Sequence, residues 1–284
     1  MIRIFTDTAA NLPKKLIKEH GINVIPLHYY IDGKEFAEDP DSEFDGKSFY
    51  DAMRRNADIT TSMTNTHSFC QAFEKALQNG DDVIYLGISG GISGTVQAAA
   101  QALEMLKEDY PDRKTKAIDT KGASLGEGMP ALYAAKLAEE GKNFEEIVAA
   151  AEQKTREMCQ YFTVEDLKYL RRGGRISKMS AFVGSILSIK PLLMGDDGKI
   201  VLFDKIRGRK KALEALAAKY KEMVSDFHLP VGIAHADCDE DANKLLKMIQ
   251  DIGFAGKLLK VCYEPVTGAH VGPGTVALFF YTKR

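Results

Sequence analysis

A serine- and glycine-rich segment at residues 87–95 (GISGGISGT) separates an apolar run from a long amphipathic stretch. Glycines let a backbone approach a ligand closely, and the N-terminus of a helix offers unpaired N–H groups that bind anions. The spacing is not GxGxxG and no lysine follows, so a nucleotide-binding loop is not indicated. Two interpretations remain: an anion site around Ser93, or a tight turn in which Ser93 caps the helix.

Hydroxyl groups gather at residues 60–66 (TTSMTNT), directly before an expected helix. Asn65 or Thr66 accounts for the cap of that helix, because a side-chain oxygen there accepts the free N–H groups of the first turn. The cluster holds more hydroxyls than capping requires. The spare ones could donate hydrogen bonds to a carboxylate, or they could serve only the local turn.

The histidine of residues 268–275 (GAHVGPGT) lies in a glycine-rich segment that leads into a strand. We expect a loop here, which would hold His270 where a ligand can meet it. A structural role is the alternative for any lone histidine. His235, at the end of an apolar strand, is the second candidate.

Two basic clusters stand out on a chain whose formal net charge is −2. Residues 171–175 (RRGGR) contain Arg172 and Arg175, and residues 207–211 (RGRKK) contain Arg207 and Arg209. Such patches suit an anion or an acidic partner surface. The alternative for the first cluster is a helix that ends at Gly173 with solvated charges around it.

Familiar catalytic motifs are absent from the sequence. It contains no GxSxG and no HExxH, and the four cysteines never form a CxxC pair. Asp7 and Asp119 end predicted strands, where α/β active sites often lie, but both also suit a turn or a helix cap. We expect no metal site.

Composition places the chain among globular proteins, with 45% hydrophobic and 27% charged residues over 284 positions. The net charge gives no field for nucleic-acid binding. The first residues resemble a strand rather than a signal peptide, and no apolar run is long enough to cross a bilayer. We therefore expect a cytoplasmic protein.

Strands and helices alternate in the first half of the chain. The hydrophobic patterns predict strands at 2–5, 22–27, 83–88 and 116–118, and helices at 14–20, 47–55, 66–78, 93–109, 125–140 and 144–158. A loop is expected at 39–45. Asn143 and Glu146 have the spacing of a capping box for the last of these helices. This alternation favours a parallel sheet covered on both faces.

The pattern changes after about residue 158. Strands are expected at 161–164, 192–194, 199–203, 231–235, 258–262 and 276–281, with helices at 177–188, 210–224 and 240–253. Residues 195–198 (GDDG) predict a hairpin. We therefore predict an α/β protein with two domains: residues 1–158 with a mainly parallel sheet, and residues 159–284 as an α+β domain with a mixed sheet.

Together these segments resemble the bacterial DegV family, which includes the fatty-acid-binding subunit of fatty acid kinase. The resemblance runs from residues 6–12 (TDTAANL) to residues 268–274 (GAHVGPG). It rests most on the stretch at 167–177 (LKYLRRGGRIS), followed at the family's spacing by GAHVGPG. The resemblance implies the two-domain fold, with a lipid between the domains and its tail buried in the second.

The resemblance also implies the ligands of the lipid carboxylate. They would be Thr61, Ser93 and His270, with Ser62 and Gly94 close by. The family commonly carries Pro-Ser shortly after the Thr-Ser pair, whereas residues 63–65 here are MTN. Residues 181–187 (AFVGSIL) are a candidate wall for the acyl tail, with an ordinary core helix as the alternative.

In the fatty acid kinase system a separate ATP-using protein phosphorylates the bound acid, so the resemblance implies a carrier without cofactor or phosphate loop. Arg172, Arg175, Arg207 and Arg209 are then candidates for docking that kinase or steadying the acyl phosphate. A transient contact with a membrane surface is a further expectation. Two other functions stay open: an enzyme acting on a small carboxylated or phosphorylated metabolite at Ser93, and a scaffold whose lipid is only structural.

Overall fold

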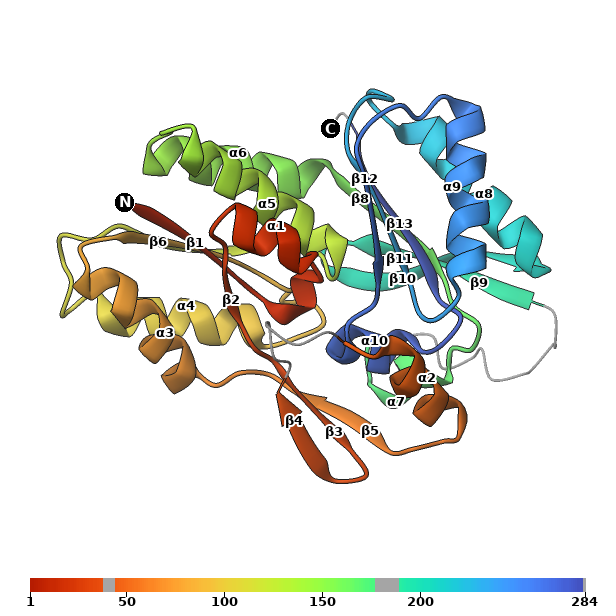
Figure 1. The fold of residues 1–284 in the computed structure, drawn as a ribbon, viewed down its shortest axis with the longest axis horizontal. Helices are drawn as coiled ribbons and strands as arrows, with labels where there is room; N and C mark the ends of the chain where they lie inside the picture. Colours follow the sequence, from red (N-terminus) through yellow and green to blue (C-terminus); the bar gives the residue numbers. More distant parts are fainter. Residues whose placement is uncertain (38–43, 177–188, 283–284) are drawn as a thin grey trace.

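The computed structural model describes residues 1–37, 44–176 and 189–282. Within these ranges the strands form three sheets (Figure 1). The expected loop at 39–45 lies largely outside the described residues. The expected helix at 177–188 and the tail wall at 181–187 lie outside them entirely.

The N-terminal sheet has four parallel strands in the order β2-β1-β6-β7. They are β1 Ile2–Asp7, β2 Asn23–Ile25, β6 Asp82–Gly87 and β7 Thr115–Asp119. Helices α3 (Thr66–Gln78) and α4 (Thr95–Leu106) cover one face, while α5 (Leu125–Glu139) and α6 (Phe144–Glu157) lie over the other (Figure 1). Helix α1 (Lys14–Glu19) connects β1 to β2. The parallel sheet predicted from the alternating pattern is confirmed.

The C-terminal sheet has six strands in the order β10-β9-β8-β13-β11-β12. They are β8 Met158–Thr163, β9 Ile189–Asp196, β10 Lys199–Arg207, β11 Val231–His235, β12 Leu258–Cys262 and β13 Val276–Tyr281. Only β11 and β12 pair in parallel, so the predicted mixed sheet is confirmed. Helices α8 (Arg209–Met223) and α9 (Asp239–Ile252) pack on one face around a separate apolar core.

A small antiparallel sheet, β4-β3-β5, was absent from the predicted elements. It comprises β3 His28–Ile31, β4 Lys34–Ala37 and β5 Ile59–Ser62, and helix α2 (Gly46–Arg54) connects β4 to β5. These strands have only four residues each, too few to show a clear alternation of apolar and polar side chains. The hydroxyl cluster therefore begins on a strand.

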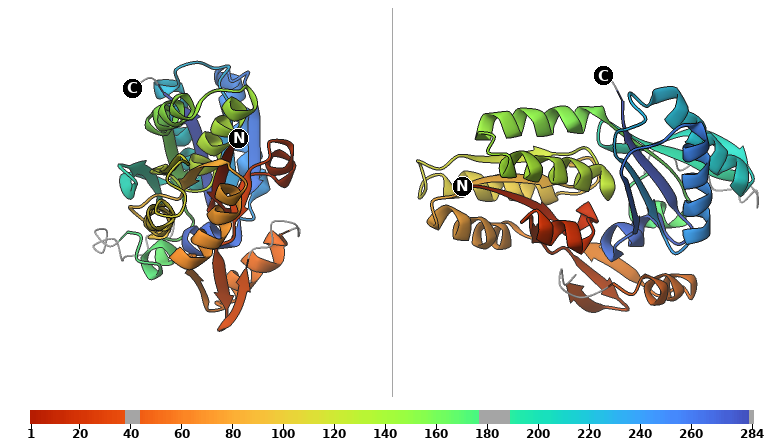
Figure 2. Two further views of the ribbon diagram at one scale, coloured as in Figure 1. Left: turned by 90° about the vertical axis from the view of Figure 1, so that its left-hand side faces the viewer. Right: turned by 45° about the horizontal axis from the view of Figure 1, so that its top comes forward.

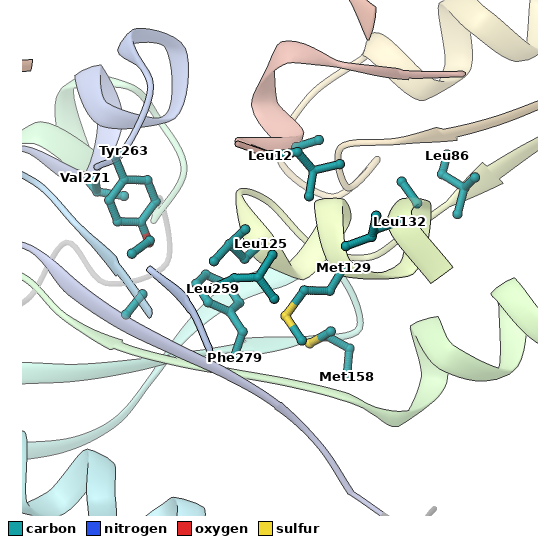
Figure 3. Close-up of a cluster of buried hydrophobic side chains, with 14 of the residues drawn as sticks. Leu12, Leu86, Leu125, Met129, Leu132, Met158, Leu259, Tyr263, Val271 and Phe279 are labelled. Atoms are coloured by element: carbon teal, nitrogen blue, oxygen red, sulfur yellow. The ribbon is translucent and has the colours of Figure 1, made fainter. Parts of the chain in front are cut away.

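Helix α5 joins the two large sheets into one core. Its first eight residues, 125–132, are all buried, because it packs against β1 and β6 on one side and β8 and β11 on the other. Figure 3 shows Leu125 near Leu259 and Phe279 of the C-terminal sheet, and Met129 facing Met158. Figure 2 shows the two large sheets next to each other along the longest dimension of the molecule.

Several local predictions are confirmed. The helix at 66–78 and the strands at 231–235, 258–262 and 276–281 have the predicted bounds. Asn143 and Glu146 form the predicted capping box at the start of α6. The β9–β10 hairpin turns at 197–198.

One local prediction is wrong, and one helix begins two residues later than predicted. Residues 265–271 form helix α10 (Pro265–Val271) instead of a loop, with Pro265 at its start and Glu264 as its cap. Ser93 is not the cap of α4, because the helix begins at Thr95 and Gly94 takes the capping position. No helix in the described parts of the chain is long and apolar enough to span a bilayer.

Candidate functional site

A cavity of about 400 Å³ lies between the two halves of the chain. Its apolar walls come from both halves and include Leu27, Ile88, Phe162, Leu170, Ile200, Val266, Val271, Ala277 and Phe279. Its polar lining includes Thr61, Ser62, Ser93, Thr95, Arg175 and His270. The cavity thus combines hydroxyl, imidazole and guanidinium groups with an apolar space.

Thr61 reaches the cavity from β5, where it pairs in register with Tyr29 of β3. Its Oγ1 lies 2.7 Å from Nε2 of His270, a residue 209 positions later in the chain. Sequence spacing offered these two residues only as separate candidates. The structure brings them into direct contact, because the last turn of α10 packs against β5.

Helix α10 holds His270 with a buried acidic cap. The carboxylate of Glu264 accepts hydrogen bonds from the backbone N–H groups of Val266 and Thr267. Burial raises the pKa of Glu264 to about 7. Burial, together with the cationic Arg175 and Arg172, lowers the pKa of His270 to about 3. The imidazole is therefore neutral at physiological pH and faces the cavity as a dipole rather than as a cation.

Ser93 lines the cavity from the turn that precedes α4. Its Oγ lies 2.8 Å from Thr95 Oγ1 and accepts the backbone N–H of Thr95 at 3.3 Å. The turn is fixed from the sheet side, because Asp119 Oδ1 accepts the N–H of Gly90 at 3.2 Å. A hydroxyl that can both donate and accept thus stands beside the N-terminus of a twelve-residue helix.

Ser62 and Gly94 also line the cavity, as expected from their neighbours. Met63 lines it too, although 48% of its surface is exposed. A Cβ atom on Gly94 would lie 2.8 Å from Met63 Sδ, so this glycine allows the methionine to pack against the start of α4. Met63, the residue directly after Ser62, therefore places a flexible thioether at this edge of the cavity.

The four candidate arginines separate into two pairs. Arg175 lines the cavity, and its Nε donates to the carbonyl of Ile92 at 3.0 Å. Arg172 donates to the carbonyl of Ile59 at 3.2 Å. Arg207 and Arg209 do not line the cavity. Arg209 pairs instead with Asp241 at 2.8 Å and donates to the carbonyl of Gly274 at 2.7 Å.

The remaining sequence candidates have structural contacts. Asp7 caps the short turn Thr8–Ala10, accepts the hydroxyl of Tyr85 at 2.6 Å, and is fully buried, which raises its pKa to about 6. Asp119 accepts the N–H of Lys121 at 2.9 Å. His235 lies 3.3 Å from Asp239 and does not line the cavity. The turn or cap interpretation of both aspartates is confirmed.

Sequence reasoning missed part of the lining. Gln160 of β8 lines the cavity and bridges the two halves: its Nε2 donates to the carbonyl of Lys121 at 3.1 Å, and its Oε1 accepts the N–H of Ala123 at 3.3 Å. A glutamine inside the apolar strand MCQYFT was the available signal. Phe162, Ala277 and Phe279 carried no such signal, since apolar residues in strands are ordinary core.

No group of three or more potential metal ligands occurs among the residues that the structure describes. All four cysteines are free thiols, and burial raises the pKa of Cys238 to about 11. The polar lining of the cavity thus combines hydroxyls, a neutral imidazole and the guanidinium of Arg175 with the side chains of Lys121, Gln160 and Lys199. Such donors suit a carboxylate.

Comparison with known proteins identifies the family of the chain. A family model described as uncharacterised protein, DegV family, matches residues 1–283. A DegV domain-containing protein of Clostridium perfringens is 41% identical over 279 residues, covering 98% of this chain and 96% of the relative.

Two solved structures have nearly the same fold as this chain. A fatty-acid-binding DegV family protein from Thermus thermophilus is 30% identical, with a TM-score of 0.90 and 99% of each chain covered. DegV from Bacillus subtilis, a fatty acid binding protein, is 32% identical, with a TM-score of 0.84 and the same coverage. The sequence motifs, the paired sheets and these matches lead to one conclusion: the chain belongs to the DegV family.

Proposed function

We propose that the protein binds a long-chain fatty acid in the cavity between its two halves. Thr61, Ser93 and His270 bind the carboxylate, with Ser62 and Gly94 beside it, and the acyl tail runs along the apolar walls. The observation that carries the proposal is the contact between Thr61 and His270 in a cavity whose remaining walls are largely apolar.

The tail supplies most of the binding free energy in this proposal. Burying one methylene contributes about 0.8 kcal/mol, so about fourteen methylenes supply roughly 11 kcal/mol before the cost of association. A hydrogen bond to a charged group adds about 1.5–3 kcal/mol. The polar residues therefore set the orientation of the ligand and select an acid over an alcohol or an ester.

The two halves share this work. We propose a boundary near residue 158, where α6 ends and β8 begins. Residues 1–158 contribute Thr61 and Ser93, and residues 159–284 contribute His270 and much of the apolar wall. We propose that the protein acts in the cytoplasm as a carrier and uses no cofactor. The fatty-acid-binding relatives from Thermus thermophilus and Bacillus subtilis support it.

Mass spectrometry of denatured, purified protein and titration with added ligand test the proposal. We expect a co-purifying fatty acid, and we expect the chain to bind an acid at least tenfold more tightly than the matching alcohol. Thr61→Val and Ser93→Ala should reduce that preference while the protein stays folded. Recovery of no fatty acid, together with no uptake of added acid, would rule the proposal out.

We also propose that the bound carboxylate is presented to a separate ATP-dependent kinase. Arg172, which is exposed, and Arg175, which lines the cavity, lie close enough to His270 to lower its pKa. Both are suited to contact the kinase or an acyl phosphate. Arg207 and Arg209 would extend the docking surface away from the cavity, and a transient membrane contact would allow loading.

Replacing each arginine by alanine tests this role in a phosphorylation assay with the partner kinase. We expect Arg172→Ala to slow acyl-phosphate formation without changing fatty-acid affinity. Unchanged phosphorylation by this variant would show that Arg172 does not serve the kinase. Turnover of a small metabolite without any partner would instead favour an enzyme.

A further inference from the structure

Two adjacent glycines follow α7 (Lys168–Arg172), and they are needed for opposite reasons. Gly173 has φ −73° and ψ −9°, a conformation open to any residue. A Cβ atom there would nevertheless lie 2.2 Å from Nδ1 of His270. Gly174 has φ +75°, which disfavours other residues, but a Cβ atom there would meet nothing within 4 Å. Of the two glycines, only Gly173 must lack a side chain because of a neighbouring side chain, that of His270.

The space left by the missing side chain of Gly173 determines where the imidazole of His270 sits. Its Nδ1 faces the Cα of Gly173, which is not a hydrogen-bond acceptor, and no described residue accepts a hydrogen bond from it. Its Nε2 faces Thr61 Oγ1 at 2.7 Å. A neutral imidazole carries one proton, and in this position the proton belongs on Nε2.

That choice of tautomer sets the direction of the hydrogen bonds. With its proton on Nε2, His270 in the ligand-free protein donates to Thr61 Oγ1 and so acts on an incoming carboxylate through Thr61, whose hydroxyl proton is then free to point into the cavity. The reverse tautomer would make Thr61 donate to His270 and would present a lone pair to an incoming anion. The position of the His270 ring, which sets its tautomer, therefore decides whether Thr61 donates to a carboxylate.

The same segment also reaches the other binding residue. Arg175 donates to the carbonyl of Gly173 and, through Nε, to the carbonyl of Ile92, the residue before Ser93. Arg172 donates to the carbonyl of Ile59, two residues before Thr61 on β5. Gly173 thus contacts His270, while Arg172 and Arg175 contact the backbone near the two hydroxyls.

We propose that Gly173 is a positioning residue for the carboxylate site: its lack of a side chain seats His270 as the Nε2–H donor to Thr61, and Arg175 ties that seat to the Ser93 turn. This inference rests on the proposed fatty-acid function. It gives the RRGGR motif an internal role, in addition to any contact with a partner.

Gly173→Ala tests the proposal, with Gly174→Ala as the matched control. We expect Gly173→Ala to fold, because its backbone conformation suits alanine, and to lose roughly tenfold in fatty-acid affinity together with its preference for an acid over the matching alcohol. Gly174→Ala should lower the melting temperature through backbone strain yet keep both binding properties. Equal affinity losses in the two variants would contradict the proposal.

A double-mutant cycle separates positioning from general damage. If Gly173 acts through the ring, Gly173→Ala should have no further effect on affinity in a His270→Ala background, where the alanine leaves room for the new methyl group. Additive losses would overturn the proposal.

Nitrogen-15 NMR of the histidine side chains in the ligand-free protein gives a readout that does not depend on binding. We expect His270 in the wild type to be neutral, with its proton on Nε2, and we expect this signature to change in Gly173→Ala but not in Gly174→Ala. A proton on Nδ1 in the wild type would overturn the inference. Failure of the wild type to bind any fatty acid would overturn the proposed function, while this NMR result would still test the seat of the ring.

Discussion

At the scale of single residues, the proposed site would bind an anion mainly with neutral donors. Thr61, Ser93 and His270 contribute hydroxyl and imidazole groups, and Arg175, which lines the same cavity, donates to the carbonyl of Ile92 next to Ser93. Neutral donors cost less to bury than a charge does, which would matter in a cavity whose apolar walls also hold the proposed acyl tail. Such an arrangement would select a carboxylate mainly through hydrogen bonds from neutral groups.

The neutral state of His270 predicts how affinity depends on pH. Because its pKa is about 3, His270 does not titrate between pH 5.5 and pH 8, and its protonation should contribute less than a twofold change in fatty-acid affinity over that range. Calorimetric titration at several pH values measures this. A loss of affinity with a midpoint near the ordinary histidine pKa of about 6.5 would show that His270 titrates normally.

A buried acid pair predicts a second pH effect, on stability. Glu127 accepts the hydroxyl of Thr6 at 2.8 Å, and burial and the neighbouring Asp7 raise its pKa well above the ordinary value. The folded state therefore keeps protons that the unfolded chain releases. The free energy of unfolding should fall as pH rises from the unfolded pKa of about 4.3 through the folded pKa values.

Glu127→Gln keeps the neutral shape and should remove part of that fall. Urea unfolding at pH 5 and pH 8 measures the difference, with Glu108→Gln on an exposed site as the control. An equal fall in wild type and Glu127→Gln would contradict a raised pKa at Glu127.

The residues of the site were predictable only in part from the sequence. Residue types identified Ser93, His270 and the hydroxyl cluster that contains Thr61 as separate candidates, and the family resemblance grouped them into one site. The contact of Thr61 with His270 depends on β5 meeting α10, which no local pattern reveals. Arg207 and Arg209 resembled Arg172 and Arg175 in the sequence, but only the latter pair lies near the cavity, because tertiary structure separates the two clusters.

At the scale of elements, strong local signals gave correct predictions and weak ones failed. The capping box of α6 and the glycine hairpin of β9 and β10 are stabilised within a few residues, so their sequences suffice. Helix α10 was missed because its glycines and proline resemble a loop. Its signal was Glu264 followed by Pro265, a cap with proline in the first turn.

The capping box provides a test at this scale. Asn143 Oδ1 accepts the N–H of Glu146 at 2.9 Å, and the Glu146 carboxylate accepts the N–H of Asn143 at 2.9 Å. Asn143→Ala should cost about 1 kcal/mol of stability, since the first turn loses its partner. Fatty-acid affinity should not change, because α6 does not line the cavity. Chemical denaturation with Lys142→Ala as a control measures the cost; a loss below a few tenths of a kcal/mol would contradict it.

At the scale of the whole molecule, the cavity exists because two sheets meet across α5 and across a buried polar contact. Ser89 Oγ donates to the carbonyl of Gly198 in the β9–β10 turn at 2.7 Å and accepts the N–H of Gly91 at 3.1 Å. This contact links the turn that carries Ser93 to the C-terminal sheet. Both partners line the cavity.

Ser89→Ala should therefore affect both stability and binding. The carbonyl of Gly198 and the N–H of Gly91 would lose a buried partner, at a cost of about 1–3 kcal/mol. Fatty-acid affinity should fall together with the free energy of unfolding. Ser225→Ala removes another hydroxyl-to-carbonyl hydrogen bond, to Tyr281, that lies away from the cavity. It should reduce stability alone, and a similar loss of affinity in that control would argue against a specific role for Ser89.

The position of β13 has a consequence for how the chain reaches its native state. This strand comes latest of the six in sequence, yet it lies between β8 and β11 in the middle of the C-terminal sheet. During synthesis β8 and β11 both emerge before the strand that pairs them, and the buried face of α5 must wait for the same event. Nascent chains therefore pass through a stage with two unpaired strand edges, which is when holding chaperones would have most to do.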